Sequence, residues 1–222
     1  MREDLELQID QLRRSVVSMA ERADSMLSGA VAALAEGDMG AADVVIETDK
    51  LLDRAYEQVQ HGVLAVVALH GPVGRDLRLL TALIHVSLHL ERMGDYAVSV
   101  ARTAQRSSAY PADADLTNEL AEMGELARQV ARSAMQAFVH TDVDLAHEVA
   151  RLDDGVDRLN FGIFHRLVRL AAEDENRLEW ATRMIQLTRL LERFADHGVD
   201  IAEQAVFVAT GEATELSSND PS

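Results

Sequence analysis

Apolar residues recur every three or four positions along most of this chain. The first such stretch runs from Leu5 to Leu34, and its spacing predicts one long amphipathic helix. The sequence Gly-Asp-Met-Gly at 37–40 ends this helix, because glycine disfavours helical backbone. The same spacing predicts five further helices, over about 41–70, 75–107, 113–140, 143–172 and from the acidic turn after 172 to about 210.

Two breaks in the pattern organise the chain. Gly71-Pro72-Val73-Gly74 is the strongest turn signal, since proline cannot continue a helix and glycine tolerates turn backbone. The second break is the polar linker 107–111, after which the order of helices begins again. The sequence therefore predicts an all-α protein made of two three-helix units, 1–108 and 112–210, followed by a disordered tail at 211–222.

The two units resemble each other in detail. Aligning 43–62 with 147–166, and 83–101 with 184–202, superimposes acidic residues on acidic residues. The matched pairs are Asp49 with Asp153, Asp53 with Asp157, Glu91 with Glu192 and Asp95 with Asp196. Such self-similarity indicates an internal duplication, and long helices with short connections predict two tandem up-down bundles.

Composition and charge exclude several classes of function. A formal net charge of −17 argues against a sequence-independent grip on nucleic acid or on an anionic membrane, because such binding needs clustered Lys and Arg. The chain has no Cys, which excludes a disulfide framework and a thiolate metal site. No apolar stretch approaches the roughly 18 residues of a membrane span, so we expect a soluble, cytoplasmic protein.

Acidic residues recur at i, i+4 spacing, which places both side chains on one face of a helix. Like charges at this spacing destabilise a helix by about 0.2–0.5 kcal/mol per pair, so four pairs at repeat-equivalent positions need an explanation. We interpret them as metal ligands, because converging carboxylates suit hard cations. The candidate ligands are Asp49, Asp53, Glu91 and Asp95 in the first unit and Asp153, Asp157, Glu192, Asp196 and, by helical spacing, Asp200 in the second.

The neighbours of these acids refine the hypothesis. A set of carboxylates without Cys suits iron, manganese, magnesium or calcium better than zinc or copper. Small residues beside the acids, Gly94, Gly155 and Ala195, would let the helices approach closely enough to share an ion. His197 follows one of the acids directly and is a candidate outer ligand.

Two other interpretations stay open. The acids could instead pair with arginines on a solvated face, which would make the protein a helical adaptor whose acids only keep it soluble. The arginines concerned are Arg54, Arg92, Arg158 and Arg193. A carboxylate-bridged di-metal oxidase would need Glu-x-x-His motifs, but the third residue after Glu91 is Gly94 and the third after Glu192 is Ala195. No phosphate-binding loop or nucleophile motif occurs, so we expect a protein that is not an enzyme.

Four stretches of the chain resemble one known family. They are IETDKLLDR at 46–54, PVGRDLR at 72–78, LERMGD at 90–95 and LERFADH at 191–197. In this order, and with the same internal duplication, they are similar to the PhoU family of phosphate-uptake regulators over about residues 5–211. Tyr96 departs from the family pattern, because many relatives carry His after the acid of the first unit.

The resemblance implies tandem three-helix bundles whose Glu/Asp-x-x-x-Asp motifs hold metal clusters, iron first and otherwise manganese, magnesium, calcium or zinc. It also implies a cytosolic negative regulator that couples the ATPase subunit of the phosphate-specific ABC transporter to a sensor histidine kinase. We further expect a homodimer that lies beside membrane complexes without entering the membrane. The charged residues Arg75, Asp76 and Arg78 are our candidates for one partner contact.

Overall fold

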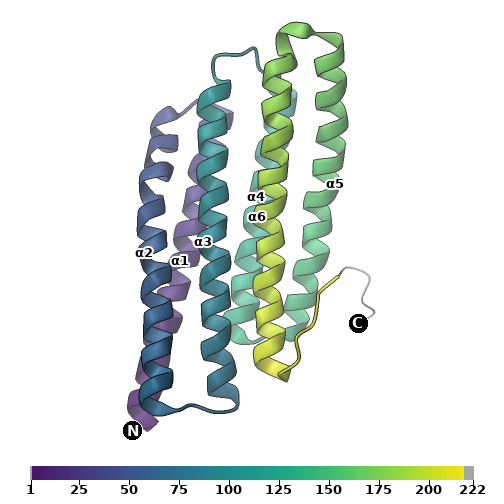
Figure 1. The fold of residues 1–222 in the computed structure, drawn as a ribbon. Helices are drawn as coiled ribbons and strands as arrows, with labels where there is room; N and C mark the ends of the chain where they lie inside the picture. The colour runs from purple at the N-terminus through teal and green to yellow at the C-terminus, as the bar shows by residue number, and fades with distance from the viewer. Residues whose placement is uncertain (1, 218–222) are drawn as a thin grey trace.

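Long helices lying side by side make up the described structure, residues 2–217 of a computed structural model (Figure 1). The elements within these residues are α1 (Arg2–Glu36), α2 (Met39–His70), α3 (Arg75–Ser107), α4 (Ala114–His140), α5 (Val143–Glu173), a single 3-10 turn η1 (Glu175–Arg177) and α6 (Leu178–Thr210). The predicted all-α fold is confirmed, and the helices begin and end close to the expected positions. Across the described residues, none of these helices combines the length and apolarity that crossing a membrane requires.

Aspartate caps explain where several helices begin. The side chain of Asp38 accepts a hydrogen bond from the backbone N–H of Ala41 at the start of α2. Asp142 does the same for Leu145 at the start of α5, which is the corresponding helix of the second unit. These bonds satisfy backbone donors that a helix leaves unpaired at its N-terminus. The duplication therefore extends from the helices to their caps.

The two units pack into one body with one core. The first unit consists of α1, α2 and α3, and the second of α4, α5 and α6 (Figure 1). Contact between the units is made by α3 against α6, which run in opposite directions, and by α1 against α4. Buried apolar side chains from all six helices form a single cluster that crosses this contact. The repeats are therefore halves of one hydrophobic core.

Helices α2 and α5 lie on the outside of the molecule. Among the described elements, each packs against the other helices of its own unit, and α5 also contacts η1. Their buried residues form one stripe, whereas α3 and α6 bury side chains on several sides. The outer faces of α2 and α5 leave large apolar side chains exposed, among them Leu64, Leu69 and Phe161. These faces are available to other molecules.

The chain after α6 turns back along the bundle. Gly211 ends the helix in the left-handed conformation, with φ of 86°. Residues 211–217 have no regular structure, yet Leu216 is buried and its backbone N–H donates to Oε1 of Glu203 at 2.9 Å. The first part of the predicted disordered tail is thus held against α6 by an apolar anchor, while 218–222 lie outside the described residues.

Candidate metal centres

The four acids expected to form a site in the first unit lie on α2 and α3 close enough for their charges to interact, but within residues 2–217 no three of them bring ligand atoms within 4.8 Å of one another. Burial raises the pKa of Asp49, and the negative charges of Asp53 and Asp95 raise it further, against the opposing charge of Arg102. The pKa of Glu91 is raised in the same way, first by burial and then by Asp95, with smaller contributions from Asp53 and Asp49. The carboxylates therefore repel one another across the two helices.

Arginine neutralises only part of this cluster. Arg92 lies 3.2 Å from Oδ2 of Asp95 and 3.5 Å from Oε2 of Glu91, but half of its own side chain is exposed. Oε2 of Glu91 is buried and has no hydrogen-bond partner in the part of the chain that the structure describes. Within residues 2–217, no ion pair reaches Asp49 or Asp53. Ion pairing with arginine therefore accounts for the α3 side of the cluster, while the α2 side has only the more distant charge of Arg102.

Close packing of α2 against α3 brings these acids within reach of one another. Gly94 faces Leu52, and a Cβ on this glycine would lie 2.4 Å from Cδ2 of Leu52. Leu52 and Gly94 directly precede Asp53 and Asp95 in sequence. Gly94 therefore lies at a close approach of α3 to α2 beside the acids, while the sharing of an ion between these helices stays a prediction.

The acids of the second unit lie on α5 and α6, again close enough for their charges to interact, and in the described chain no three of them bring ligand atoms within 4.8 Å of one another. Burial raises the pKa of Asp153 to about 7, with further contributions from Asp196, Asp157, Asp154 and Glu192. The pKa of Asp196 rises to about 6, again through burial first and then through Glu192 and Asp157. Burial also raises the pKa of Asp157, followed by the charge of Asp154. The carboxyl pKa values rise further in this cluster than in the first, and burial is the first cause of each shift.

Two details of the second cluster differ from expectation. Asp154 joins the cluster electrostatically, although the i, i+4 pattern does not include it; its position next to Asp153 was the available signal. Gly155 faces Leu126 of α4, and a Cβ on this glycine would lie 2.9 Å from Cδ2 of Leu126. The glycine therefore allows close packing of α5 against α4 and not against α6. In the described chain Arg158 and Arg193 are exposed and form no ion pair with the cluster, unlike Arg92 in the first unit.

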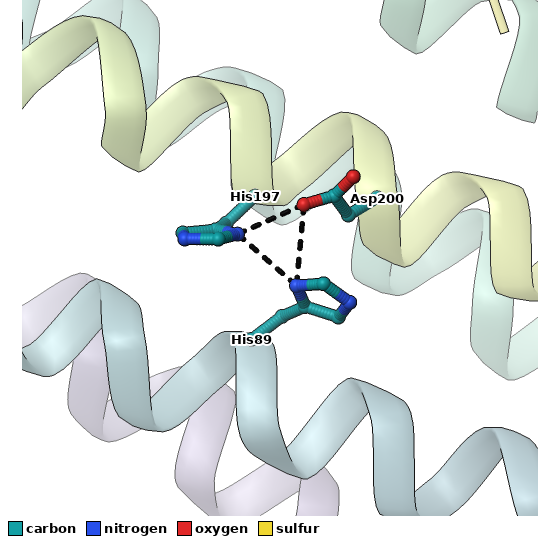
Figure 2. Close-up of side chains that lie close together, drawn as sticks. All are labelled: His89, His197 and Asp200. Carbon is teal, nitrogen blue, oxygen red and sulfur yellow. Dashed lines mark hydrogen bonds and ion pairs between the residues drawn. The ribbon is translucent and has the colours of Figure 1, made fainter. Parts of the chain in front are cut away.

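Asp200 has different partners from those expected. Its Oδ2 lies 2.9 Å from Nδ1 of His197 and 3.2 Å from Nδ1 of His89 (Figure 2). Burial raises the pKa of Asp200, but the hydrogen bonds with His197 and His89 outweigh this effect and leave the pKa below its usual value. Asp200 therefore belongs to a mixed cluster with two histidines, although its charge still reaches Asp196. The sequence prediction missed His89.

The residues predicted to contact a partner begin α3, in agreement with the helix expected from position 75. Arg75 and Asp76 are exposed there. Arg78 is half-buried beside Gly211, and its Nε is buried without a hydrogen-bond partner. A role for these three residues in binding a partner stays a prediction.

Comparison with known protein families identifies both repeats of this chain. The family model for the PhoU domain matches residues 16–104 and again residues 120–205, so the internal duplication is also a duplication of this domain. The chain belongs to the PhoU family. The two matches contain the two acid clusters, one in each PhoU domain.

Named relatives match the chain almost from end to end. A PhoU homologue of the phosphate-specific transport system from Clostridium acetobutylicum is 27% identical over 217 residues, which cover 97% of this chain and 99% of the relative. A Caulobacter vibrioides homologue is 30% identical over 210 residues, covering 95% and 90% of the two chains. The crystal structure of PhoU from Pseudomonas aeruginosa superimposes with a TM-score of 0.87 and 28% identity, covering 93% of this chain and 99% of that one. The Clostridium and Caulobacter homologues are named as accessory proteins of the phosphate-specific transport system.

Proposed function

We propose that this PhoU-family protein is a non-enzymatic negative regulator of phosphate uptake and of the phosphate-starvation response. In this role it couples the ATPase subunit of a phosphate-specific ABC transporter to a sensor histidine kinase. Full-length similarity to proteins named as accessory components of phosphate-specific transport supports the assignment. The protein acts in the cytoplasm, beside its membrane-bound partners.

The observation that carries the metal part of the proposal is the pair of acid clusters. Each gathers carboxylates from two helices, and burial together with mutual repulsion raises carboxyl pKa values in both. A bound divalent cation would remove this repulsion, and iron is our first choice, followed by manganese, magnesium, calcium and zinc. The proposed ligands are Asp49, Asp53, Glu91 and Asp95 at one site and Asp153, Asp157, Glu192 and Asp196 at the other.

Surface chemistry supports a role in protein contacts. The net charge of −17 favours basic protein surfaces as partners. The exposed apolar side chains on α2 and α5 provide area that a second copy or a partner can cover, and we propose a homodimer as the resting form. The exposed start of α3, with Arg75 and Asp76, is a further proposed contact.

A pair of matched variants tests this function. Asp49→Asn/Asp53→Asn removes two charges from the first cluster, while Glu47→Gln/Glu57→Gln removes two exposed charges from the same helix. Each is introduced into a bacterial host that lacks its own PhoU homologue. Metal content is measured on protein purified without chelator, and repression of a phosphate-starvation reporter is measured at high phosphate.

We expect the cluster variant to lose metal at one site and to derepress the reporter, while the control behaves as wild type. Loss of metal without derepression would leave a helical adaptor and remove the regulatory role of the metal. Absence of metal from the wild-type protein would remove the metal part altogether. Failure of the wild type to co-purify with either the transporter ATPase or the sensor kinase would contradict the proposed coupling.

A further inference from the structure

A third cluster of ligand atoms lies where the two repeats meet. His89 projects from α3 of the first unit, and His197 and Asp200 project from α6 of the second (Figure 2). The two Nδ1 atoms are 3.0 Å apart, and Oδ2 of Asp200 lies 3.2 Å from that of His89 and 2.9 Å from that of His197. Three potential ligand atoms from both halves of the protein therefore converge on one point.

Hydrogen bonds alone cannot pair all three of these atoms with one another. A neutral imidazole carries one ring proton, and the carboxylate only accepts. If both Nδ1 atoms are protonated, both donate to Asp200, but the two donor nitrogens then lie only 3.0 Å apart with no hydrogen bond between them. If only one Nδ1 is protonated, a nitrogen lone pair faces a carboxylate lone pair or the other ring. One cation accepting all three lone pairs would satisfy every edge of the triangle.

We propose that His89, His197 and Asp200 bind a divalent transition-metal ion of the zinc type. Zinc bonds of about 2.0–2.2 Å to imidazole nitrogen and carboxylate oxygen set neighbouring ligand atoms about 2.9 Å apart at right angles and about 3.4 Å apart in a tetrahedron. The observed separations of 2.9 to 3.2 Å fall inside this range. Imidazole nitrogen also selects zinc and its neighbours over magnesium and calcium, which prefer oxygen.

The surroundings hold the ligands in place and leave room to complete the coordination. Tyr96 stacks on the ring of His197, with 5.6 Å between centroids and 18° between planes. The side chains of His89 and His197 are 19% and 20% exposed, so an ion and water can reach the site. Glu203, one turn after Asp200 on α6, interacts electrostatically with both Asp200 and His89 and is positioned near the site. These features make a partly open site, as three protein ligands require.

This site differs from the duplicated acid clusters because the duplication does not reproduce it. The repeat alignment matches His89 with Leu190, His197 with Tyr96, and Asp200 with Ser99. The symmetry-related position on the α3–α6 contact therefore lacks this donor set. A transition metal at His89 would bind once per chain and would link the two repeats, independently of the regulatory function proposed above.

The 15N NMR chemical shifts of the histidine side chains provide the direct test. The protein is labelled with 15N-histidine in a background that neutralises two acids of each cluster, Asp49→Asn/Asp53→Asn/Asp153→Asn/Asp157→Asn, and is titrated with zinc chloride. We expect the Nδ1 signals of His89 and His197 to shift at one equivalent of zinc. His89→Gln and His197→Gln should each weaken zinc binding at least tenfold by calorimetry, whereas His61→Gln, an exposed histidine on α2, should not change it.

The outcomes separate this site from the acid clusters. The proposal is supported if zinc binding persists in the four-Asn background and weakens at least tenfold in both His89→Gln and His197→Gln. This result does not depend on whether the proposed regulatory function is correct. Unchanged His89 and His197 signals at saturating zinc, or equal zinc affinity in His89→Gln and His61→Gln, would overturn it. Circular dichroism of each variant verifies folding, and having two separate ligand variants keeps the test valid if one of them does not fold.

Discussion

Replacing Gly94 with alanine tests whether the close packing of α2 on α3 builds the first acid cluster. The new Cβ would lie 2.4 Å from Cδ2 of Leu52. Carbon atoms pack at about 3.5–4.0 Å, so the two groups must separate by at least about 1 Å. Because Leu52 precedes Asp53 and Gly94 precedes Asp95, this displacement also moves the carboxylates apart.

The expected magnitude follows from two opposing effects. Overpacking a core destabilises a protein by about 1–3 kcal/mol, while alanine is more favourable than glycine in a helix by up to about 1 kcal/mol. The net loss should be about 1–2 kcal/mol, which lowers Tm by about 2–8 °C in a protein of this size. Metal affinity at the first cluster should fall about tenfold, the equivalent of about 1.4 kcal/mol, with the second cluster unaffected.

Thermal denaturation and calorimetric metal titration measure these two effects. Gly162→Ala on α5 is the matched control, because a Cβ there meets nothing within 4 Å. The control should be as stable as wild type or more stable by up to about 1 kcal/mol. Wild-type Tm and wild-type metal affinity in Gly94→Ala would refute the packing argument.

The second repeat suggests a compensating change. At the positions equivalent to Gly94 and Leu52 it carries Ala195 and Val156, both buried. Adding Leu52→Val to Gly94→Ala should therefore recover part of the lost stability, with a favourable coupling of about 1–2 kcal/mol. Simple addition of the two losses would show that Leu52 is not the obstructing side chain.

Three further predictions concern protons and caps. The pKa of Asp153 is raised to about 7 in the folded protein, so the folded state binds more protons than the unfolded state between about pH 4 and 7. Metal-free protein should therefore lose stability as pH rises through this window, and Asp153→Asn should flatten the dependence in urea melts at several pH values. Metal binding at this cluster should release protons and strengthen between pH 6 and 8, measurable by titration in buffers of different ionisation enthalpy; no proton release would contradict the raised pKa of Asp153 and Asp196. Asp142→Ala and Asp38→Ala should each lower stability by about 1 kcal/mol through loss of a helix cap, and unchanged denaturation midpoints would show that these bonds contribute nothing.

Much of the fold and both acid clusters could be predicted because their signals are local. Apolar spacing reports helices directly, and acids four residues apart share a helix face whatever the rest of the chain does. The repeat then indicated which helices carry matching acids. Asp49 and Asp53 could therefore be matched with Glu91 and Asp95 without knowledge of the packing.

The mixed cluster could not be predicted because it depends on how α3 crosses α6. Four residues advance a helix by slightly more than one turn, so each i+4 step rotates the side chain by about 40°. Asp200 therefore turns away from the face of Asp196 and toward His89 on the other repeat. His89 has no histidine or acid at its equivalent position, Leu190, so comparing the repeats gave no signal for it.

The single core shared by the two repeats has a consequence for how such a chain is assembled. One three-helix unit alone would expose the apolar faces of α1 and α3. A second copy of the same unit could bury these faces by packing against them. A linker as short as 107–111 makes that pairing intramolecular, so it no longer depends on protein concentration. Once joined, the halves are free to differ at matching positions, as His89 and Leu190 do, and the fused chain gains surfaces that no symmetric pair of identical units can present.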